Sequence, residues 1–510
     1  MSMRRIKGFL FLVGVTLLMS ACSHVQEDSE QQVVEIKLSD ENILVDNHVA
    51  EKNVESAVYL ANDIVYYEEG KDYTYGEGSE KDAHSVEEAS EHTVVHITEP
   101  GTYSLSGTLS RGQIAVDLGE DANKNSEAVV TLILNEVDIT CQVAPAVIFY
   151  NVYECSDNDT DNATKDVDTS SAGANIIIAD GTQNTINGSY VEKIYKPDSV
   201  VLNEDGTNVK DAKKLHKYDG AFYSCMSMNI TGEKENSGVL NINAENEGLD
   251  SEMHLTVNGG NIHIQSGNDG INTNADGVSV TTINDGNLTI KVTGETGEGD
   301  GIDSNGWLVI NGGNVLASAC SNSADAGIDS DMGIHINGGT VVAAGHMLDR
   351  IEEGGQTYAV FNFAQKQDGT ETFYIKNKDG DVVLETKFEN AYSVLVYSSS
   401  DLKEGTYTLW NNDQQLNGHS GEMMRGPENN DASGMRPEHF EGMEPPEGFD
   451  KGVPPKDVPP KDEQGPGKPD EEMRKAPNPG WKNPQNMQDA VAEFQMKNGA
   501  NMFGQISCIE

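Results

Sequence analysis

The stretch that decides the fold is "DGIDSNGWLVINGGNV" (Asp300–Val315), which returns as "AGIDSDMGIHINGGTV" (Ala326–Val341). Each copy has an acidic loop, a short apolar run and an asparagine-glycine turn. Aligned on the asparagine of that turn, the unit recurs at Asn258, Asn284, Asn311 and Asn337, with spacings of 26, 27 and 26 residues. A fixed period of this length is typical of a solenoid.

The apolar runs of the repeat predict the type of solenoid. They are only a few residues long, as in "HLTV", "NIHI", "LTIKV" and "WLVI", and glycine or asparagine follows most of them. A repeat of this length cannot hold a strand, a crossover helix and a second strand. Corners with positive φ favour glycine and asparagine. The sequence therefore predicts an all-β fold, a parallel β-helix with one coil per repeat.

Composition divides the rest of the chain. We expect the β-helix to cover residues 33–355, with a polar loop near Tyr153–Ser171, and a β segment over residues 356–412 to cap its open end. Residues 413–510 are rich in proline, glycine, methionine and charge, which predicts a disordered tail with one short helix near Gln488–Lys497.

The N-terminus has the pattern of a secretion signal. Basic Arg4, Arg5 and Lys7 precede an apolar run that is too short to cross a bilayer, and "MSAC" ends at Cys22. The pattern predicts a lipoprotein signal over residues 1–22, lipidation of Cys22, a tether over residues 23–32 and an extracellular, membrane-anchored protein. The alternative is ordinary secretion with cleavage nearby.

The charge limits the partners. The chain has 84 acidic and 34 basic residues, for a net charge of -50. Such a surface repels nucleic acid and anionic lipid headgroups. Nucleic acid is therefore excluded as a partner, whereas cations, neutral glycans, and anionic glycans held through cations remain.

The repeat predicts columns of oxygen ligands, because equivalent residues of neighbouring coils stack about 4.8 Å apart. One column has Glu247, Asp269 and Asp300, with Asp325 one position out of register. The second has Asp250, Asn272, Asp303 and Asp329, and Asp331 ends a third column two residues further on.

Stacked carboxylates need cations. Residues 219–346 contain 17 carboxylates but only two lysines and no arginine, so we expect no internal ion pairs to neutralise the columns. Neighbouring charges at this spacing repel by about 1 kcal/mol in water and by more inside a protein. Clustered oxygens suit Ca²⁺, and the glycine that follows each acid is expected to turn carbonyls toward the ion. The alternative is a set of solvated acidic turns.

The ordered set of motifs resembles a known family. "DGINT", "DGIDS" and "NGGN", with "GTYSLSGTLSRGQIAVD", "VTLILNEVDIT" and "ANIIIADGTQNTING", resemble secreted bacterial carbohydrate-binding β-helix proteins, which are related in fold to pectate lyases and were formerly described as a domain of unknown function. The resemblance covers Val33–Trp410. It implies a right-handed parallel β-helix, bound calcium, and binding to polygalacturonate-like and cellulose-like polysaccharides. Its acidic motif falls on Asp250, Asp269, Asp300, Asp303 and Asp329, whereas Asn272 and Ala326 depart from it.

Three functions follow from these features. The first is non-catalytic glycan binding, in which Ca²⁺ bridges protein and uronate carboxylates and Trp307 stacks on a sugar. The second is a calcium-dependent polysaccharide lyase, which needs a base, although the repeats contain no arginine and Lys291 has no evident partner. The third is a structural surface adhesin.

Overall fold

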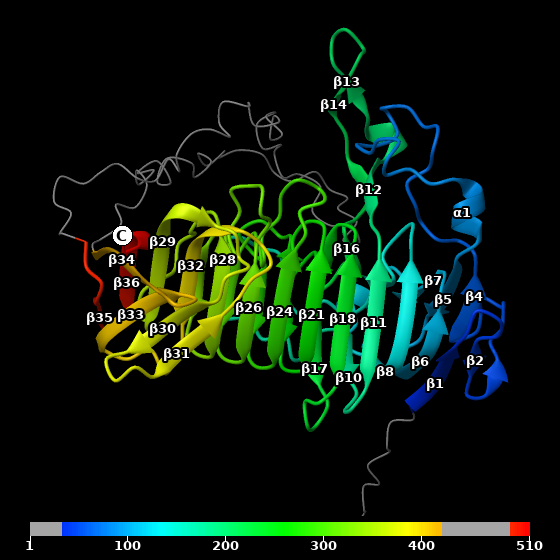
Figure 1. Cartoon of the computed structure of the whole chain (residues 1–510). Coiled ribbons are helices and arrows are strands. Elements are labelled where there is room, and N and C mark those ends of the chain that lie inside the picture. Colours follow the sequence, from blue (N-terminus) through cyan, green and yellow to red (C-terminus); the bar gives the residue numbers. More distant parts are fainter. Residues whose placement is uncertain (1–32, 421–489, 510) are drawn as a thin grey trace, which may run out of the picture. The chain divides into compact units, whose positions relative to one another are not determined.

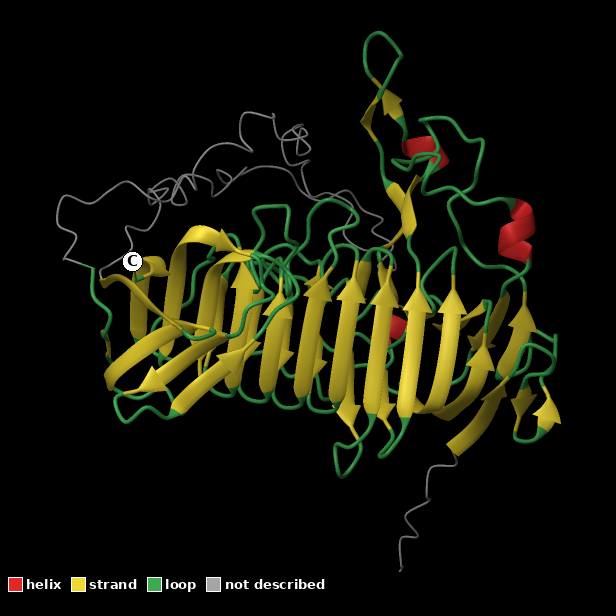
Figure 2. Cartoon of the chain, in the orientation of Figure 1, coloured by secondary structure: helices red, strands yellow, loops and turns green. Residues whose placement is uncertain are grey.

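The computed structural model describes residues 33–420 and 490–509 (Figure 1). The predicted signal (residues 1–22), the predicted tether (residues 23–32) and Cys22 lie outside these residues. The described part is all-β, as expected: its one α-helix is α1 (Val86–Ser90), and η1 (Ala122–Lys124) and η2 (Pro197–Ser199) are single 3-10 turns (Figure 2). Among the described helices none has the length and apolar character needed to cross a membrane.

Parallel pairing between successive repeats builds three ladders. Ladder A comprises β5 (Thr93–Ile97), β7 (Gly112–Asp117), β9 (Val147–Asn151), β16 (Gly220–Ser224), β19 (Glu247–Ser251) and β22 (Ile271–Thr273). Ladder B comprises β1 (Val33–Leu38), β6 (Gly101–Leu109), β8 (Val130–Cys141), β10 (Ala174–Ile178), β17 (Met228–Gly232), β20 (Leu255–Val257), β23 (Val280–Ile283), β25 (Trp307–Ile310) and β27 (Gly333–Ile336). Ladder C continues from the second half of β8 through β11 (Gln183–Gly188), β18 (Val239–Ala244), β21 (Asn261–Ser266), β24 (Asn287–Val292), β26 (Asn314–Ser318) and β28 (Thr340–Gly345).

The register of the ladders follows the repeat. In ladder C, Ile242 pairs with Ile264 and Ile264 with Ile290, so one apolar position of each repeat faces the core. These isoleucines are at most 3% exposed. Between ladders B and C the chain turns at glycine: Gly313 has a φ of 75° and Gly339 one of 80°. The asparagine-glycine motif therefore marks a turn at glycine between two strands of one repeat, as the sequence predicted.

Other short strands lie outside the ladders. Near the N-terminus β2 (Leu44–Val45) pairs with β1 and β3 (His48–Val49), and β4 (Val58–Ala61) is antiparallel to β5. Between β11 of ladder C and β16 of ladder A the chain forms an arm, which projects beyond the ends of these two strands (Figure 1). Its strands are β12 (Val191–Tyr195), β13 (Val201–Leu202), β14 (Val209–Asp211) and β15 (Lys214–Tyr218).

The parallel run ends where β28 pairs antiparallel with β32 (Tyr392–Ser398). A C-terminal unit begins there, with its own buried aromatic cluster. Its other strands are β29 (Tyr358–Gln367), β30 (Phe373–Asn377), β31 (Val382–Thr386), β33 (Gly405–Asn411), β34 (Gln414–Ser420), β35 (Phe494–Met496) and β36 (Ala500–Cys508).

This unit corrects the prediction that residues 413–510 form one disordered tail. Strand β36 pairs in parallel with β29, and β35 is antiparallel to β33. The helix expected near Gln488–Lys497 is wrong in its described part, because β35 occupies Phe494–Met496. Phe494 and Met496 are buried on either side of an exposed Gln495, a period-2 pattern that the average composition of the tail concealed. Residues 421–489 lie outside the described part.

Candidate metal centre

The second acidic column stacks as the repeat predicts. In ladder A, Asp250 pairs with Asn272. The amide N–H of Asp303 donates to the carbonyl of Ile271, and that of Asp329 donates to the carbonyl of Ile302, so the column continues through both aspartates. Exposure increases along the column: Asp250 and Asn272 are 0% and 7% exposed, whereas Asp303 and Asp329 are half-buried. One end of the column is therefore sealed from solvent and the other end is accessible.

The first column has a structural role that the sequence analysis missed. Oδ1 of Asp269 accepts the amide N–H of Asp300 at 2.7 Å, and Oδ1 of Asp300 accepts that of Ala326 at 2.5 Å. Oδ2 of Asp325 accepts the N–H of Gly299 at 2.6 Å. These carboxylates tie neighbouring repeats together through side chain to backbone hydrogen bonds. Part of the repetition of the acidic loop is thus explained without any ion.

The glycine that follows each acid corrects a second expectation. Gly248, Gly270 and Gly301 do not have positive φ. A Cβ on Gly270 would lie 2.2 Å from Cγ2 of Ile290 and 2.6 Å from the carbonyl oxygen of Gly301. A Cβ on Gly301 would likewise lie 2.3 Å from the carbonyl oxygen of Gly327. Glycine is required here because successive repeats approach closely at this corner, which explains the residue without any ion.

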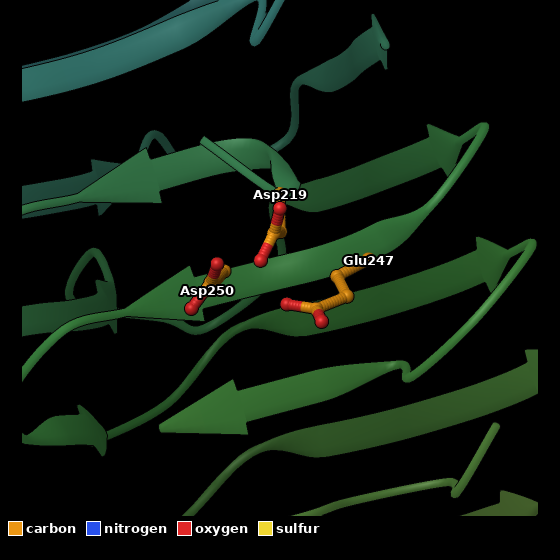
Figure 3. A group of neighbouring side chains, drawn as sticks. All are labelled: Asp219, Glu247 and Asp250. Atoms are coloured by element: carbon orange, nitrogen blue, oxygen red, sulfur yellow. The ribbon is translucent and has the colours of Figure 1, made fainter. Parts of the chain in front are cut away.

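At the sealed end, three carboxylates converge (Figure 3). Asp219 precedes β16, whereas Glu247 and Asp250 belong to β19, and one oxygen of each lies within 4.8 Å of the others. The three residues are 5%, 4% and 0% exposed. Glu247 and Asp250 were predicted ligands, but Asp219 was missed. The acid-glycine pair Asp219-Gly220 repeats the Glu247-Gly248, Asp269-Gly270 and Asp300-Gly301 pairs, and this signal identifies it.

The cluster has too few hydrogen-bond donors for its oxygens. Oε1 of Glu247 accepts Nδ2 of Asn272 at 3.1 Å, and Oδ1 of Asp250 accepts Nδ2 of Asn274 at 2.6 Å. Oε2 of Glu247, Oδ2 of Asp250 and Oδ1 of Asn272 are buried and have no donor. Buried polar atoms are nearly always paired, and leaving one unpaired costs about 1–3 kcal/mol. A cation bound among these side chains would give such oxygens a partner.

The three carboxylates of the cluster have raised pKa values. Burial, and then the charge of Asp219, raise the pKa of Glu247 to about 8. Burial and the charge of Glu247 raise the pKa of Asp250 well above its usual value, and burial raises that of Asp219. Without a cation, the site therefore holds protons near neutral pH. A bound cation would replace them, since metal ligands must be deprotonated.

One lysine corrects the expectation that no internal ion pair serves the columns. Nζ of Lys217, at the end of the arm strand β15, lies 2.7 Å from Oδ2 of Asp219. Burial alone would lower the pKa of Lys217, but Asp219, Glu247 and Asp250 raise it above its usual value. Lys291 also has a partner, Glu389 of the C-terminal unit. Lys217 lies two residues outside the segment in which lysines were counted.

The remaining predicted ligands lie further along the columns. Burial and the neighbouring aspartates raise the pKa of Asp300 to about 9. Burial, Asp349 and Asp303 raise that of Asp329 to about 7, and Asp331 is exposed. Trp307, the predicted stacking residue, lies in β25 of ladder B and is half-buried there. It is therefore on a different ladder from the carboxylates.

The donor set fits a hard divalent cation. Three carboxylates and the amide oxygen of Asn272 are oxygen ligands of the kind that Ca²⁺ takes, and the unpartnered oxygens lie where these side chains meet. A bound ion would neutralise the repulsion within the cluster. Asp219, Glu247, Asp250 and Asn272 are the residues that would hold it.

Comparison with known proteins bears on the function. A family model described as carbohydrate-binding domain-containing protein matches residues 91–387, which is more than half of the 510 residues. Among solved structures, the chain is similar to the polysaccharide lyase-like protein from C. thermocellum in its gadolinium derivative, with 20% identity, a TM-score of 0.35, and 61% of this chain and 90% of that chain covered. No curated protein matches the chain. The extent of the family match shows that the chain belongs to the carbohydrate-binding domain-containing family.

Proposed function

We propose that the protein is a non-catalytic carbohydrate-binding protein of the cell surface, built on a right-handed parallel β-helix that holds Ca²⁺ on its acidic columns. The family match to residues 91–387 supports carbohydrate binding. The parallel, in-register ladders support the β-helix. The single observation that carries the calcium proposal is the group of donorless buried oxygens on Glu247, Asp250 and Asn272.

Because solvent exposure increases along the acidic columns, we assign different roles to an ion at each end. The cluster of Asp219, Glu247 and Asp250 is at most 5% exposed, so an ion there has no room to bridge to a polymer and is structural. At the other end, Asp303 and Asp329 are half-buried and Asp331 is exposed. A cation held there would be accessible to the carboxylate of a uronate. Polygalacturonate is therefore the anionic polysaccharide that this end would bind, and cellulose-type chains are the neutral alternative.

Two observations favour binding over β-elimination. A lyase needs a base that is neutral near its working pH. Lys217, the lysine at the carboxylate cluster, has a raised pKa and is therefore protonated. His254 is buried, and burial lowers its pKa to about 4, but its Nδ1 already accepts the amide N–H of Val280 at 3.0 Å. Neither side chain is placed to take a proton from a bound polymer.

The location belongs to the same proposal. Lipidation of Cys22 would anchor the protein on the outer face of a membrane, and residues 23–32 would separate the binding domain from it. Metabolic labelling with a fatty-acid analogue, compared between the natural chain and Cys22→Ser, tests the anchor. Loss of label in the variant is expected, whereas equal labelling of both would contradict lipidation at Cys22.

The binding proposal is tested by titrating polygalacturonate and a soluble cellulose derivative into the protein, in Ca²⁺ and in chelator, while ultraviolet absorbance follows unsaturated products. Binding without products is expected, with polygalacturonate dependent on Ca²⁺. Accumulating products would make the protein a lyase. Absence of binding to either polymer in both conditions would leave a structural adhesin.

A further inference from the structure

A groove of about 710 Å³ runs along the outer face of ladder B, away from the carboxylate cluster of ladder A. Its floor is the outward-facing row of the ladder, in which Thr256 pairs with Thr282 and Thr282 with Val309. One wall is the segment 165–170. The other is a column of asparagines from the repeated turns: Asn258, Asn284, Asn311 and Asn337. Three repeats thus contribute one floor residue and one asparagine each, and the fourth contributes Asn337 alone.

The wall formed by residues 165–170 is fixed to the floor. Oγ1 of Thr169 lies 2.7 Å from both Oδ1 of Asn229 and Oγ1 of Thr256. Nδ2 of Asn229 donates back to the carbonyl of Thr169 at 2.7 Å. Thr169 is 5% exposed, so this polar segment is held against the ladder by buried hydrogen bonds. The groove is therefore a built feature of the fold, with a wall whose position is specified by side chains.

The opposite wall offers a regular set of unused hydrogen-bonding groups. Nδ2 of Asn284 donates to Oδ1 of Asn258 at 2.8 Å, Asn311 donates to Asn284 at 2.9 Å, and Asn337 donates to Asn311 at 2.8 Å. Each amide group has two N–H donors and two acceptor lone pairs. The column uses one donor and one lone pair of each inner asparagine. Because these side chains are exposed, the remaining donors and lone pairs are available to a ligand.

The charge of the groove differs from that of the whole molecule. Its lining has one lysine and two aspartates, Lys165, Asp166 and Asp168, hence a charge of -1, against -50 for the chain. Nζ of Lys165 already pairs with Asp166 at 2.6 Å. A polyuronate would meet no free cation here and would be repelled by the rest of the surface. A ligand of hydroxyl groups matches the threonine and asparagine lining without any charge.

We propose that this groove binds an extended neutral glycan of the cellulose type, an inference that rests on the proposed carbohydrate-binding function. Coils repeat about every 4.8 Å, which is close to the advance of an extended glycan per sugar ring, so successive sugars would meet equivalent asparagine side chains of the wall, with the hydroxyl of Thr282 beside them. Trp307 precedes Val309 by two residues on β25, so both side chains leave the strand on the same face, and the indole is placed to stack on a sugar beside the groove floor. The neutral and the anionic polysaccharide thus have separate sites.

The test places a long charged side chain in the groove. Thr282→Arg, at the floor, is compared with Thr289→Arg, a threonine of the same coil and similar exposure that faces outward from ladder C instead. Affinity is measured with cellohexaose by calorimetry and with hydroxyethylcellulose by affinity electrophoresis. Circular dichroism and Ca²⁺ binding verify that both variants are folded. We expect Thr282→Arg to weaken binding by about tenfold or more and Thr289→Arg to change it by less than about twofold.

The outcomes separate this inference from the proposed function. Equal binding of the neutral glucan by both variants and the natural chain would overturn the groove while leaving carbohydrate binding intact. The same holds if the natural chain binds polygalacturonate but no neutral glucan. If the natural chain binds no glycan at all, the proposed function and the groove both fail.

Discussion

Nζ of Lys217 lies 2.7 Å from Oδ2 of Asp219, so the arm of the protein places an ammonium group against the carboxylate cluster that we assign to calcium. The aspartate is 6% exposed at its side chain and the lysine 39%. The lysine supplies one positive charge to three carboxylates, and it remains on the arm strand β15, outside ladder A. The lysine therefore lowers the negative charge of the cluster but does not neutralise all three carboxylates.

Lys217→Met should strengthen calcium binding and lower the free energy of unfolding of the calcium-free protein. Removal of the ammonium takes away its repulsion of a divalent ion, so we expect the dissociation constant for Ca²⁺ to fall by about tenfold. Without calcium, the unpaired carboxylate should cost about 1–3 kcal/mol, less than for a fully buried pair because the lysine is partly exposed. Calorimetric titration and urea denaturation measure the two effects. Lys210→Met, on the exposed strand β14, is the control.

Asp250→Asn should have the opposite effects: it should stabilise the calcium-free protein and weaken calcium binding. The substitution keeps the shape of a side chain that is 0% exposed and removes a carboxyl group whose ionisation is opposed by burial and by the charge of Glu247. In chelator we expect the variant to be more stable than the natural chain by about 1 kcal/mol or more. In Ca²⁺ the order should reverse, because a ligand is lost. The exposed Asp276→Asn should leave both unfolding curves unchanged, and a variant that still gains full stability from Ca²⁺ would exclude Asp250 as a ligand.

The stability of the calcium-free protein should fall as the pH rises. The pKa of Glu247 is about 8 in the folded protein against its ordinary 4.5, so the folded state holds a proton that the unfolded state has lost between these values. The contribution of this group to stability is full below about pH 4.5, declines through neutrality and is lost by about pH 8 as the group ionises. Asp300, with a pKa of about 9, acts in the same direction.

Calcium should abolish this trend, because it replaces the protons. The free energy of unfolding, measured by urea denaturation at about pH 5 and about pH 8, should drop between them in chelator and should drop much less in Ca²⁺. The stabilisation by calcium should accordingly be larger at the higher pH. A calcium-free protein that becomes more stable toward pH 8 would contradict the raised pKa values of the cluster.

Periodicity predicted the stacking of the site, because the side chains that stack are those that occupy equivalent places in the repeat. The spacing of Asn258, Asn284 and Asn311 was enough to place Asp250 beside Asn272 in ladder A. It was not enough to find Lys217, which lies in the arm between two repeats and reaches the cluster only through the fold. Nor did it reveal that Asp300 accepts a hydrogen bond from a backbone N–H of the next repeat. A carboxylate that binds a metal and one that accepts a backbone hydrogen bond have the same sequence pattern.

Average composition did not predict the strands near the C-terminus, because their alternation of buried and exposed residues extends over only a few residues. Residues 413–510 were read as one disordered tail because proline and charge dominate the window, yet β36 alternates buried and exposed residues over part of Ala500–Cys508. A nine-residue strand is lost in an average over about a hundred residues. Its partner β29 is more than a hundred residues away in the sequence, so no local signal joined them.

The last strands should therefore contribute to stability. Phe494 is 0% exposed, and its ring lies 5.1 Å from that of Phe503 in the core of the C-terminal unit. Removal of a buried phenylalanine side chain costs about 3–5 kcal/mol. We expect Phe494→Ala to lower the free energy of unfolding of that unit by this amount, measured by urea denaturation with Trp410 fluorescence, because Trp410 lies in its strand β33. Val382→Ala, at a side chain 48% exposed in the same unit, should have little effect. Equal unfolding curves for Phe494→Ala and the natural chain would contradict a stabilising role for residues 490–509.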